Sequence, residues 1–235
     1  MTTTLSPVRS RPRLGWWLDV ALVAAFVALT AALINGHLLA LDRRVADWAF
    51  AHQPAPLYWT ARVFNYLGQG GQVLMPIALI LTGVLAYRTR SVRAVLPFAA
   101  AFVLTYVTIG PLKIWAGRAA PSFDGPDATI MFNPHASGAA AMSYPSGHMG
   151  NSLVWYAVIA LLLAAVLGRP LRAGESFAVR VLPVVILFGT TVYTGFHWLT
   201  DSVAGVLLGL FLARLIERVP WESVLTPRPR NASRA

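Results

Sequence analysis

Six long apolar stretches constrain the fold of this chain more than any other feature. A helix needs about 20 mostly apolar residues to cross the hydrocarbon core of a bilayer. Stretches of this kind lie at residues 17–36, 72–88, 94–113, 148–167, 180–197 and 201–218. Only 12% of the 235 residues are charged, about half the usual fraction of a soluble domain. The sequence therefore predicts an all-α, six-span transmembrane helical bundle.

The ends of the stretches indicate the domain organisation. The last two stretches together are too long for one span, so the chain is expected to turn at the polar interruption from Gly195 to Asp201. Arginines precede the first stretch as in a signal peptide, but its apolar core is longer and no small-residue cleavage site follows. We expect a basic tail at 1–15, a membrane domain at 16–219 and a basic, disordered tail at 220–235.

The arginines predict the orientation in the membrane. They gather in the N-terminal tail, in the link between the second and third stretches, in the link after the fourth, and after the sixth. Basic segments stay on the cytoplasmic side, so both termini are expected in the cytoplasm of a multi-pass plasma-membrane protein. The net charge of +10 is then explained by orientation and by contact with anionic lipid rather than by nucleic-acid binding.

Three polar motifs fall on the opposite, outer side of the predicted bundle. They are "PLKIWAGRAAPS" at 111–122, "YPSGH" at 144–148 and "TGFHWLTD" at 194–201. Ionisable residues inside a membrane bundle tend to be functional. The chain contains no cysteine, which excludes a thiolate nucleophile. The stretch "LGQGGQ" at 67–72 is expected to form a turn and resembles a lipid head-group contact only weakly.

His197 and Asp201 form the first candidate pair. They are four residues apart, so one helical turn, or a turn between two spans, would bring them together. An aspartate beside an imidazole fixes its tautomer and supports the charge that it gains, as a histidine nucleophile or base requires. The alternative is an interfacial histidine next to an aspartate that caps the last span.

The "YPSGH" motif predicts an anion site at the start of the fourth span. Ser146 is a natural N-cap, and Gly147 lets a ligand approach the backbone. Free N–H groups and the positive end of the helix dipole would then point outward. His148, in the same turn, is placed to protonate a leaving oxygen. The alternative is a capped helix with a bystander histidine.

Two cations complete the candidate site. Lys113 is the only lysine of the chain and lies at the outer end of the third span, where it either binds an anion or extends to the membrane surface. Arg118 is either a second cation for the anion or a solvated loop residue. Together with two histidines, a carboxylate and a helix N-terminus, these residues predict phosphoryl-group chemistry without a metal or another cofactor.

The three motifs resemble the signatures of the type 2 phosphatidic acid phosphatase family. That family reads Lys-x6-Arg-Pro, then Pro-Ser-Gly-His, then Ser-Arg-x5-His-x3-Asp, and the resemblance covers about residues 60–215. It implies that His197 attacks phosphorus to form a phosphohistidine, that Asp201 orients it and that His148 protonates the departing oxygen. Lys113, Ser146 and the Gly147 N–H are implied to hold the phosphate oxygens.

The chain departs from the family pattern at two positions. Ala120 stands where the first motif has arginine, and Thr191 stands where the third motif has arginine. Thr190, at the position of the motif serine, is expected to donate a hydrogen bond to the phosphate, and Arg118 is expected to replace part of the missing charge. Because paired arginines suit a dianionic monoester, their loss puts the kind of phosphate ester in question.

The sequence therefore leaves three functions open. The first is a phosphatase that acts at the outer face on a phosphomonoester or diphosphate of a lipid, such as polyprenyl diphosphate, phosphatidate or phosphatidylglycerol phosphate. The second is a head-group phosphotransferase acting on phosphodiesters, similar to the sphingomyelin and inositol-phosphorylceramide synthases. The third is a non-catalytic lipid-binding or scrambling relative. The expected partners are the membrane and a lipid phosphate, and the oligomeric state is open.

Overall fold

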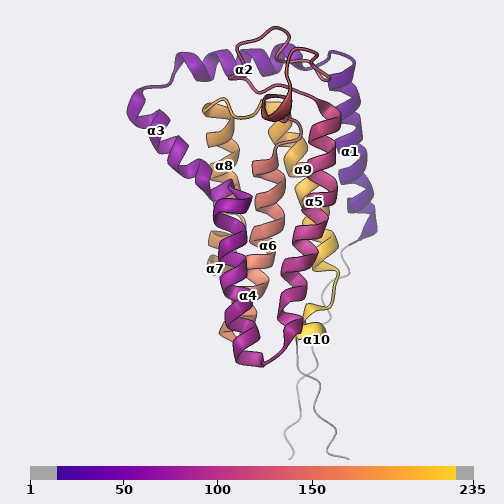
Figure 1. The fold of residues 1–235 in the computed structure, drawn as a ribbon, viewed down its shortest axis with the longest axis vertical. Helices are drawn as coiled ribbons and strands as arrows, with labels where there is room; N and C mark the ends of the chain where they lie inside the picture. Colours follow the sequence, from indigo (N-terminus) through magenta and orange to yellow (C-terminus); the bar gives the residue numbers. More distant parts are fainter. Residues whose placement is uncertain (1–14, 226–235) are drawn as a thin grey trace, which may run out of the picture.

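A computed structural model describes residues 15–225 as an all-helical bundle, which confirms the predicted fold class (Figure 1). Six segments are long and apolar enough to cross a membrane: Trp16–Ile34, Gly70–Thr89, Val92–Ala116, Gly147–Leu167, Ala173–Tyr193 and Leu199–Glu217. Their helices are α1 (Trp16–Ile34), α4 (Met75–Thr89), α5 (Leu96–Ala116), α6 (Gly147–Leu167), α7 (Ala173–Arg180), α8 (Leu182–Tyr193) and α9 (Leu199–Glu217).

The fifth span differs from its predicted bounds of 180–197. It begins at Ala173 as α7 and continues as α8, in which Pro183 occupies the first turn. Proline lacks an N–H and suits the start of a helix, which is why a new helix begins here. The span ends at Tyr193, and the last span begins at Leu199. The turn between them therefore consists of residues 194–198, and Asp201 lies inside α9.

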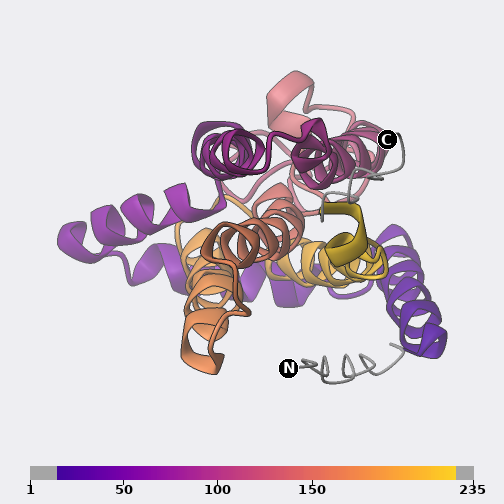
Figure 2. The ribbon, with the colours of Figure 1, turned by 90° about the horizontal axis from the view of Figure 1, so that it is seen from below.

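Helices α6 and α9 form the centre of the bundle. Half of the residues in their apolar windows are buried, against about a fifth in each of the other spans. Figure 2 shows α6 between α4 and α5 on one side and α8 and α9 on the other. Small residues allow the close contact of α6 with α9: a Cβ on Gly205 would lie 2.6 Å from the carbonyl oxygen of Ser146, and one on Gly209 would lie 3.0 Å from the Cα of Gly150.

Two helices that the sequence analysis did not predict lie between α1 and α4 in the chain. They are α2 (Leu39–Ala51) and α3 (Ala55–Phe64), and α2 lies across the ends of the spans together with the segment 117–146 (Figure 1). The buried residues of α2 are Asp42, Ala46 and Ala49, a spacing that places them on one face of the helix. Because this face is short and contains a carboxylate, its pattern is weaker than that of a span.

The C-terminal segment is more ordered than predicted. Part of the expected disordered tail at 220–235 forms α10 (Trp221–Leu225). Trp221 is buried and donates from its indole nitrogen to the carbonyl oxygen of Ile216 at 2.8 Å. Packing of this tryptophan against α9 explains why the helix forms. The remainder of both predicted tails, residues 1–14 and 226–235, lies outside the described residues.

The contact between α6 and α9 gives a prediction about stability. A methyl group at Gly205 would overlap the backbone of Ser146 and the side chain of Met149. Overpacking of this kind costs about 1–3 kcal/mol, so Gly205→Ala should lower the thermal unfolding midpoint in detergent. The matched control is Gly83→Ala, which meets nothing within 4 Å and should leave the midpoint unchanged or raise it. Equal midpoints for the two variants would contradict close packing at this seam.

Candidate active site

The sequence-predicted site residues come from four elements that meet at the end of the bundle covered by α2. Lys113 lies in the last turn of α5, and His148 lies in the first turn of α6. His197 lies in the turn between α8 and α9, and Asp201 lies in the first turn of α9. Gly195, with a φ of 71°, allows the chain to reverse just before His197.

The two histidines are in direct contact. Nδ1 of His148 lies 3.2 Å from Nε2 of His197, and the two rings meet at an interplanar angle of 70°. On its other side, Nδ1 of His197 lies 3.9 Å from Oδ2 of Asp201 and 3.4 Å from Oγ of Ser143. The Ser143 hydroxyl donates to the same carboxylate oxygen at 2.6 Å. The Nδ1 edge of His197 therefore faces an anion, and its Nε2 edge faces His148.

The carboxylate of Asp201 caps α9 and also lies beside the His197 ring. Oδ2 accepts a hydrogen bond from the backbone N–H of Trp198 at 3.0 Å, so the carboxylate caps α9. The same oxygen lies on the His197 side, as described above. The capping bond holds the carboxylate in place beside the imidazole.

The environment of His197 favours the neutral imidazole. The side chain is almost completely buried, and this desolvation lowers the pKa of His197 below its ordinary value, although Asp201 opposes the shift. A neutral imidazole has a free lone pair at one nitrogen. With Nδ1 turned toward Asp201 and Ser143, that lone pair belongs at Nε2. The buried ring is therefore suited to act as a nucleophile.

The start of α6 is built as the sequence predicted. Ser146 is the N-cap, and its hydroxyl accepts from the Met149 N–H at 3.3 Å. The Ser146 N–H donates to the backbone oxygen of Asp201 at 2.9 Å, which joins α6 to α9. Lys113 passes close to Gly147: a Cβ there would lie 3.0 Å from Cε and 3.6 Å from Nζ of the lysine. Because Gly147 has no side chain, the ammonium group of Lys113 can lie close to the N-terminal turn of α6.

Arg118 has different partners from those expected. Its side chain is fully buried, and it donates to Oδ1 of Asp201 at 2.6 Å and to Oδ2 of Asp42 at 2.7 Å. It also donates to the Thr200 hydroxyl at 2.8 Å and to the Thr129 carbonyl oxygen at 2.9 Å. Because Arg118 bonds Oδ1 of Asp201 while His197 lies beside Oδ2, the guanidinium is on the far side of the carboxylate. The structure therefore does not place Arg118 as a phosphate ligand.

The threonines at the third motif also face their own helix. The Thr190 hydroxyl points to the carbonyl oxygen of Leu187 at 3.4 Å. Thr191 is fully buried and donates to the same oxygen at 2.7 Å. The structure thus does not bring Thr190 into contact with the histidines, and the phosphate-binding role expected for Thr190 stays a prediction.

Several residues near the site were not found by sequence reasoning. Asp42 and Ser143 hold the network around Asp201, and Gln69, from the "LGQGGQ" stretch, brings its amide nitrogen within 3.5 Å of Nε2 of His148. Ser143 directly precedes the "YPSGH" motif, which was the available signal. Asp42 comes from an interfacial helix far away in the sequence, and its only signal was a carboxylate on the apolar face of that helix.

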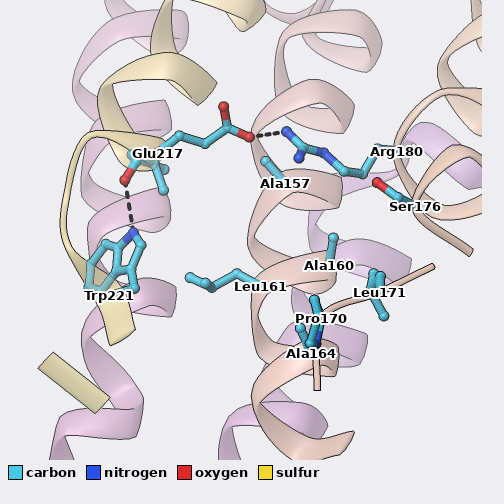
Figure 3. Close-up of a pocket in the computed structure, with 11 residues that line it drawn as sticks. Ala157, Ala160, Leu161, Ala164, Pro170, Leu171, Ser176, Arg180, Glu217 and Trp221 are labelled. Carbon is cyan, nitrogen blue, oxygen red and sulfur yellow. Dashed lines mark hydrogen bonds and ion pairs between the residues drawn. The ribbon is translucent and has the colours of Figure 1, made fainter. Parts of the chain in front are cut away.

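A hollow lies along the opposite half of α6. It has a volume of about 370 Å³, and the residues that Figure 3 draws around it include small side chains of α6 and the ion pair of Arg180 with Glu217. Its lining contains no histidine. The chemistry of the hollow is therefore unlike that of the site at the start of α6.

Metal binding was not expected from the sequence. In the described part of the chain, no group of three histidine, cysteine, aspartate or glutamate side chains is arranged to hold an ion. Metal-independent activity stays a prediction, which a chelator tests directly.

Comparisons with known proteins agree with the fold and with the family resemblance. The sequence model of the PAP2 superfamily matches residues 94–225, which is more than half of the chain. A relative from Bacillus subtilis (strain 168), phosphatidylglycerophosphatase B, is 29% identical over 203 residues, which cover 84% of this chain and 92% of the relative. A crystal structure of a transmembrane PAP2 type phosphatidylglycerolphosphate phosphatase from Bacillus subtilis shares the fold, with a TM-score of 0.70 and 23% identity over 91% of this chain and 100% of that chain.

The protein is thus a multi-pass membrane enzyme of the lipid phosphatase class. The chain belongs to the PAP2 superfamily, and the matched segment contains all three polar motifs. The resemblance found from those motifs is confirmed.

The position of Arg118 gives a prediction about stability. Arg118→Gln leaves the carboxylates of Asp42 and Asp201 buried without their shared cation, and breaking a buried ion pair costs about 3–5 kcal/mol. The unfolding midpoint in detergent should fall strongly, whereas the exposed control Arg93→Gln should not change it. An arginine that serves only a substrate would be dispensable for folding, so an unchanged midpoint for Arg118→Gln would restore the phosphate-binding role.

Proposed function

We propose that this enzyme hydrolyses a phosphomonoester or diphosphate of a lipid through a phosphohistidine intermediate at the outer face of the membrane. The observation that carries the proposal is the order His148, His197, Asp201, in which an imidazole with an anion at Nδ1 presents Nε2 to a second imidazole. This order supplies a nucleophile, its orienting carboxylate and a proton donor.

The reaction has two balanced steps. In the first, Nε2 of His197 forms a bond to phosphorus while the bond from phosphorus to the leaving oxygen breaks, and that oxygen takes a proton from His148. In the second, water gives a proton to His148 and attacks phosphorus, which breaks the bond to His197 and releases phosphate. A phosphorus atom cannot fit between two nitrogens 3.2 Å apart, so substrate binding must separate the two rings.

The phosphate oxygens meet the start of α6 and Lys113. The first turn of α6 provides backbone N–H groups at the positive end of the helix dipole, including that of Gly147. The Lys113 ammonium donates to the carbonyl oxygen of Met142 and passes beside Gly147, so it can turn toward the same anion. Ser146 contributes chiefly by capping this turn. Arg118 acts through Asp201, which it holds in place.

The relative's name favours one substrate from the set that the sequence left open. A phosphatidylglycerophosphatase acts on phosphatidylglycerol phosphate, which makes this lipid the first to test, with polyprenyl diphosphate and phosphatidate beside it. The head-group phosphotransferase remains a second candidate because the two family arginines are absent at Ala120 and Thr191, and Arg118 is paired elsewhere. Phosphate release and head-group exchange measured in parallel distinguish the two, and binding without turnover would indicate the non-catalytic function.

The proposed chemistry predicts the effect of replacing the histidines. His197→Ala and His148→Ala should each lower kcat by at least about 100-fold, because each removes a reacting group. His197→Ala should also abolish the acid-labile phosphoenzyme that forms from radiolabelled substrate. The solvated His135→Ala is the control, and the chelator EDTA should have no effect. Retained phosphoenzyme in His197→Ala would exclude this residue as the nucleophile.

The proposed chemistry also predicts how kcat/KM depends on pH. Only the neutral imidazole of His197 is a nucleophile, and burial lowers its pKa below the usual 6.5 or so. After correction for the ionisation of the substrate phosphate, the fall of kcat/KM on the acid side should therefore lie below the usual imidazole range. A fall centred above that range would mean that His197 is stabilised as the cation.

We also propose that the site faces outward. The segment 117–146 lies at the α2 end of the bundle, and the arginine-rich turn between α4 and α5 lies at the other end (Figure 1). Cysteines placed at the exposed positions Asp124 and Arg172 in this cysteine-free chain should differ in their reaction with an impermeant thiol reagent on intact cells. Asp124→Cys should be labelled from outside and Arg172→Cys only after permeabilisation. The opposite pattern would place the chemistry in the cytoplasm.

A further inference from the structure

An arginine outside the family motifs lies beside the catalytic histidines. Arg62 belongs to α3, one of the interfacial helices, and its guanidinium carbon is 4.7 Å from the centre of the Phe196 ring. The Phe196 ring in turn stacks on the His148 ring, with centroids 5.6 Å apart and an interplanar angle of 19°. One aromatic ring therefore separates the Arg62 cation from the proposed proton donor.

The other two cations of the candidate site are already engaged. Arg118 is bonded to Asp42 and Asp201, and Lys113 lies at the start of α6. The contacts of Arg62 are of another kind, since its guanidinium lies over the rings of Phe196 and Tyr58. Neither of these contacts is a hydrogen bond, so they leave the N–H groups of Arg62 available to an anion. Arg62 is also only partly buried, so a ligand can reach it.

The position of Arg62 defines which part of a substrate it would meet. Under the proposed function, the phosphoryl group that is transferred lies between the His197 and His148 rings, with its non-bridging oxygens toward Lys113. The leaving oxygen lies toward His148, which protonates it. Phe196 and Arg62 extend the site beyond His148, so Arg62 is on the leaving-group side of the bond that breaks. An anion bound there belongs to the leaving group and not to the transferred phosphate.

We propose that Arg62 is a specificity-determining residue that binds a second, negatively charged phosphate in the leaving group. This proposal rests on the proposed function above. The enzyme would then favour lipids in which a further phosphate follows the terminal one, either directly, as in a polyprenyl diphosphate, or after a glycerol, as in phosphatidylglycerol phosphate. Phosphatidate, whose leaving group is an uncharged diacylglycerol, gains nothing from Arg62.

The test compares substrates in one variant. Arg62→Gln removes the charge and keeps a polar side chain, and kcat/KM is measured for phosphatidylglycerol phosphate, a polyprenyl diphosphate and phosphatidate in the same detergent. A hydrogen bond between charged groups is strong enough that kcat/KM for the two lipids with a second phosphate should fall at least about tenfold. For phosphatidate it should stay within about twofold of the unaltered enzyme. Arg62→Lys should restore part of the loss, because it restores the charge but not the planar donors.

Arg44→Gln is the matched control. Arg44 is an exposed arginine of the neighbouring interfacial helix α2, so its replacement makes the same change of charge at the same end of the bundle. It should not alter the ratio of kcat/KM between phosphatidylglycerol phosphate and phosphatidate. An equal loss on all three substrates in Arg62→Gln, or no loss on any, would overturn the proposal. Failure of the proposed function is separate, because it would appear as phosphatidate hydrolysis that survives in His197→Ala.

Discussion

The structure depends on the buried carboxylate of Asp201. A carboxylate in such a place is costly unless hydrogen bonds and a cation compensate for the lost water. Arg118 bonds one of its oxygens, and Ser143 and the N–H of Trp198 bond the other. Because these groups come from different segments, satisfying one carboxylate fixes the end of α5, the loop before α6 and the start of α9 in one arrangement.

Asp42 extends the same network to the surface helices. It accepts from Arg118 at 2.7 Å and from the backbone and side chain of Thr200 at 3.0 and 2.5 Å. The helix α2 is thereby attached to the first turn of α9 at Thr200, the residue next to Asp201. An interfacial helix that looks peripheral in the sequence thus belongs to the support of the catalytic end. Within the first motif, Arg118 is thereby bonded to two buried carboxylates, whereas Lys113 lies beside Gly147 at the start of α6.

The sequence predicted those features that depend on local pattern. The six spans follow from apolar length, and the start of α6 follows from Ser146 and Gly147, whose capping and small size act within one helical turn. The partners of Arg118 were not predictable in this way. Its position close to Ala120, where the family pattern has arginine, suggested that Arg118 is a phosphate ligand, but its side chain is bonded to Asp42, which is 76 residues away. The partners of such a side chain are decided by contacts between segments that are distant in the sequence. Neither the spacing of residues nor the composition predicts these contacts.

The close contact between His148 and His197 connects the proposed substrate binding with the segment between α3 and α4. His197 is held on its Nδ1 side, next to Asp201 and Ser143. His148 is packed against Gly68, where even a Cβ would lie 3.0 Å from the imidazole carbon Cδ2. Under the proposed mechanism a phosphoryl group enters between the two rings, and the segment around Gly68 is the side that would move, because His197 is held next to Asp201 and Ser143.

That segment is continuous with α3 and therefore with Arg62. It consists of a short 3₁₀ turn at Asn65–Gly68 and a π-helical turn at Gly70–Leu74, and irregular turns of this kind are common at functional sites. Under the two proposals above, a substrate bound to Arg62 would act on the same stretch of chain that packs against His148. Recognition of the leaving group and access to His197 would then be coupled, and a lipid that reaches Arg62 would gain in kcat as well as in KM.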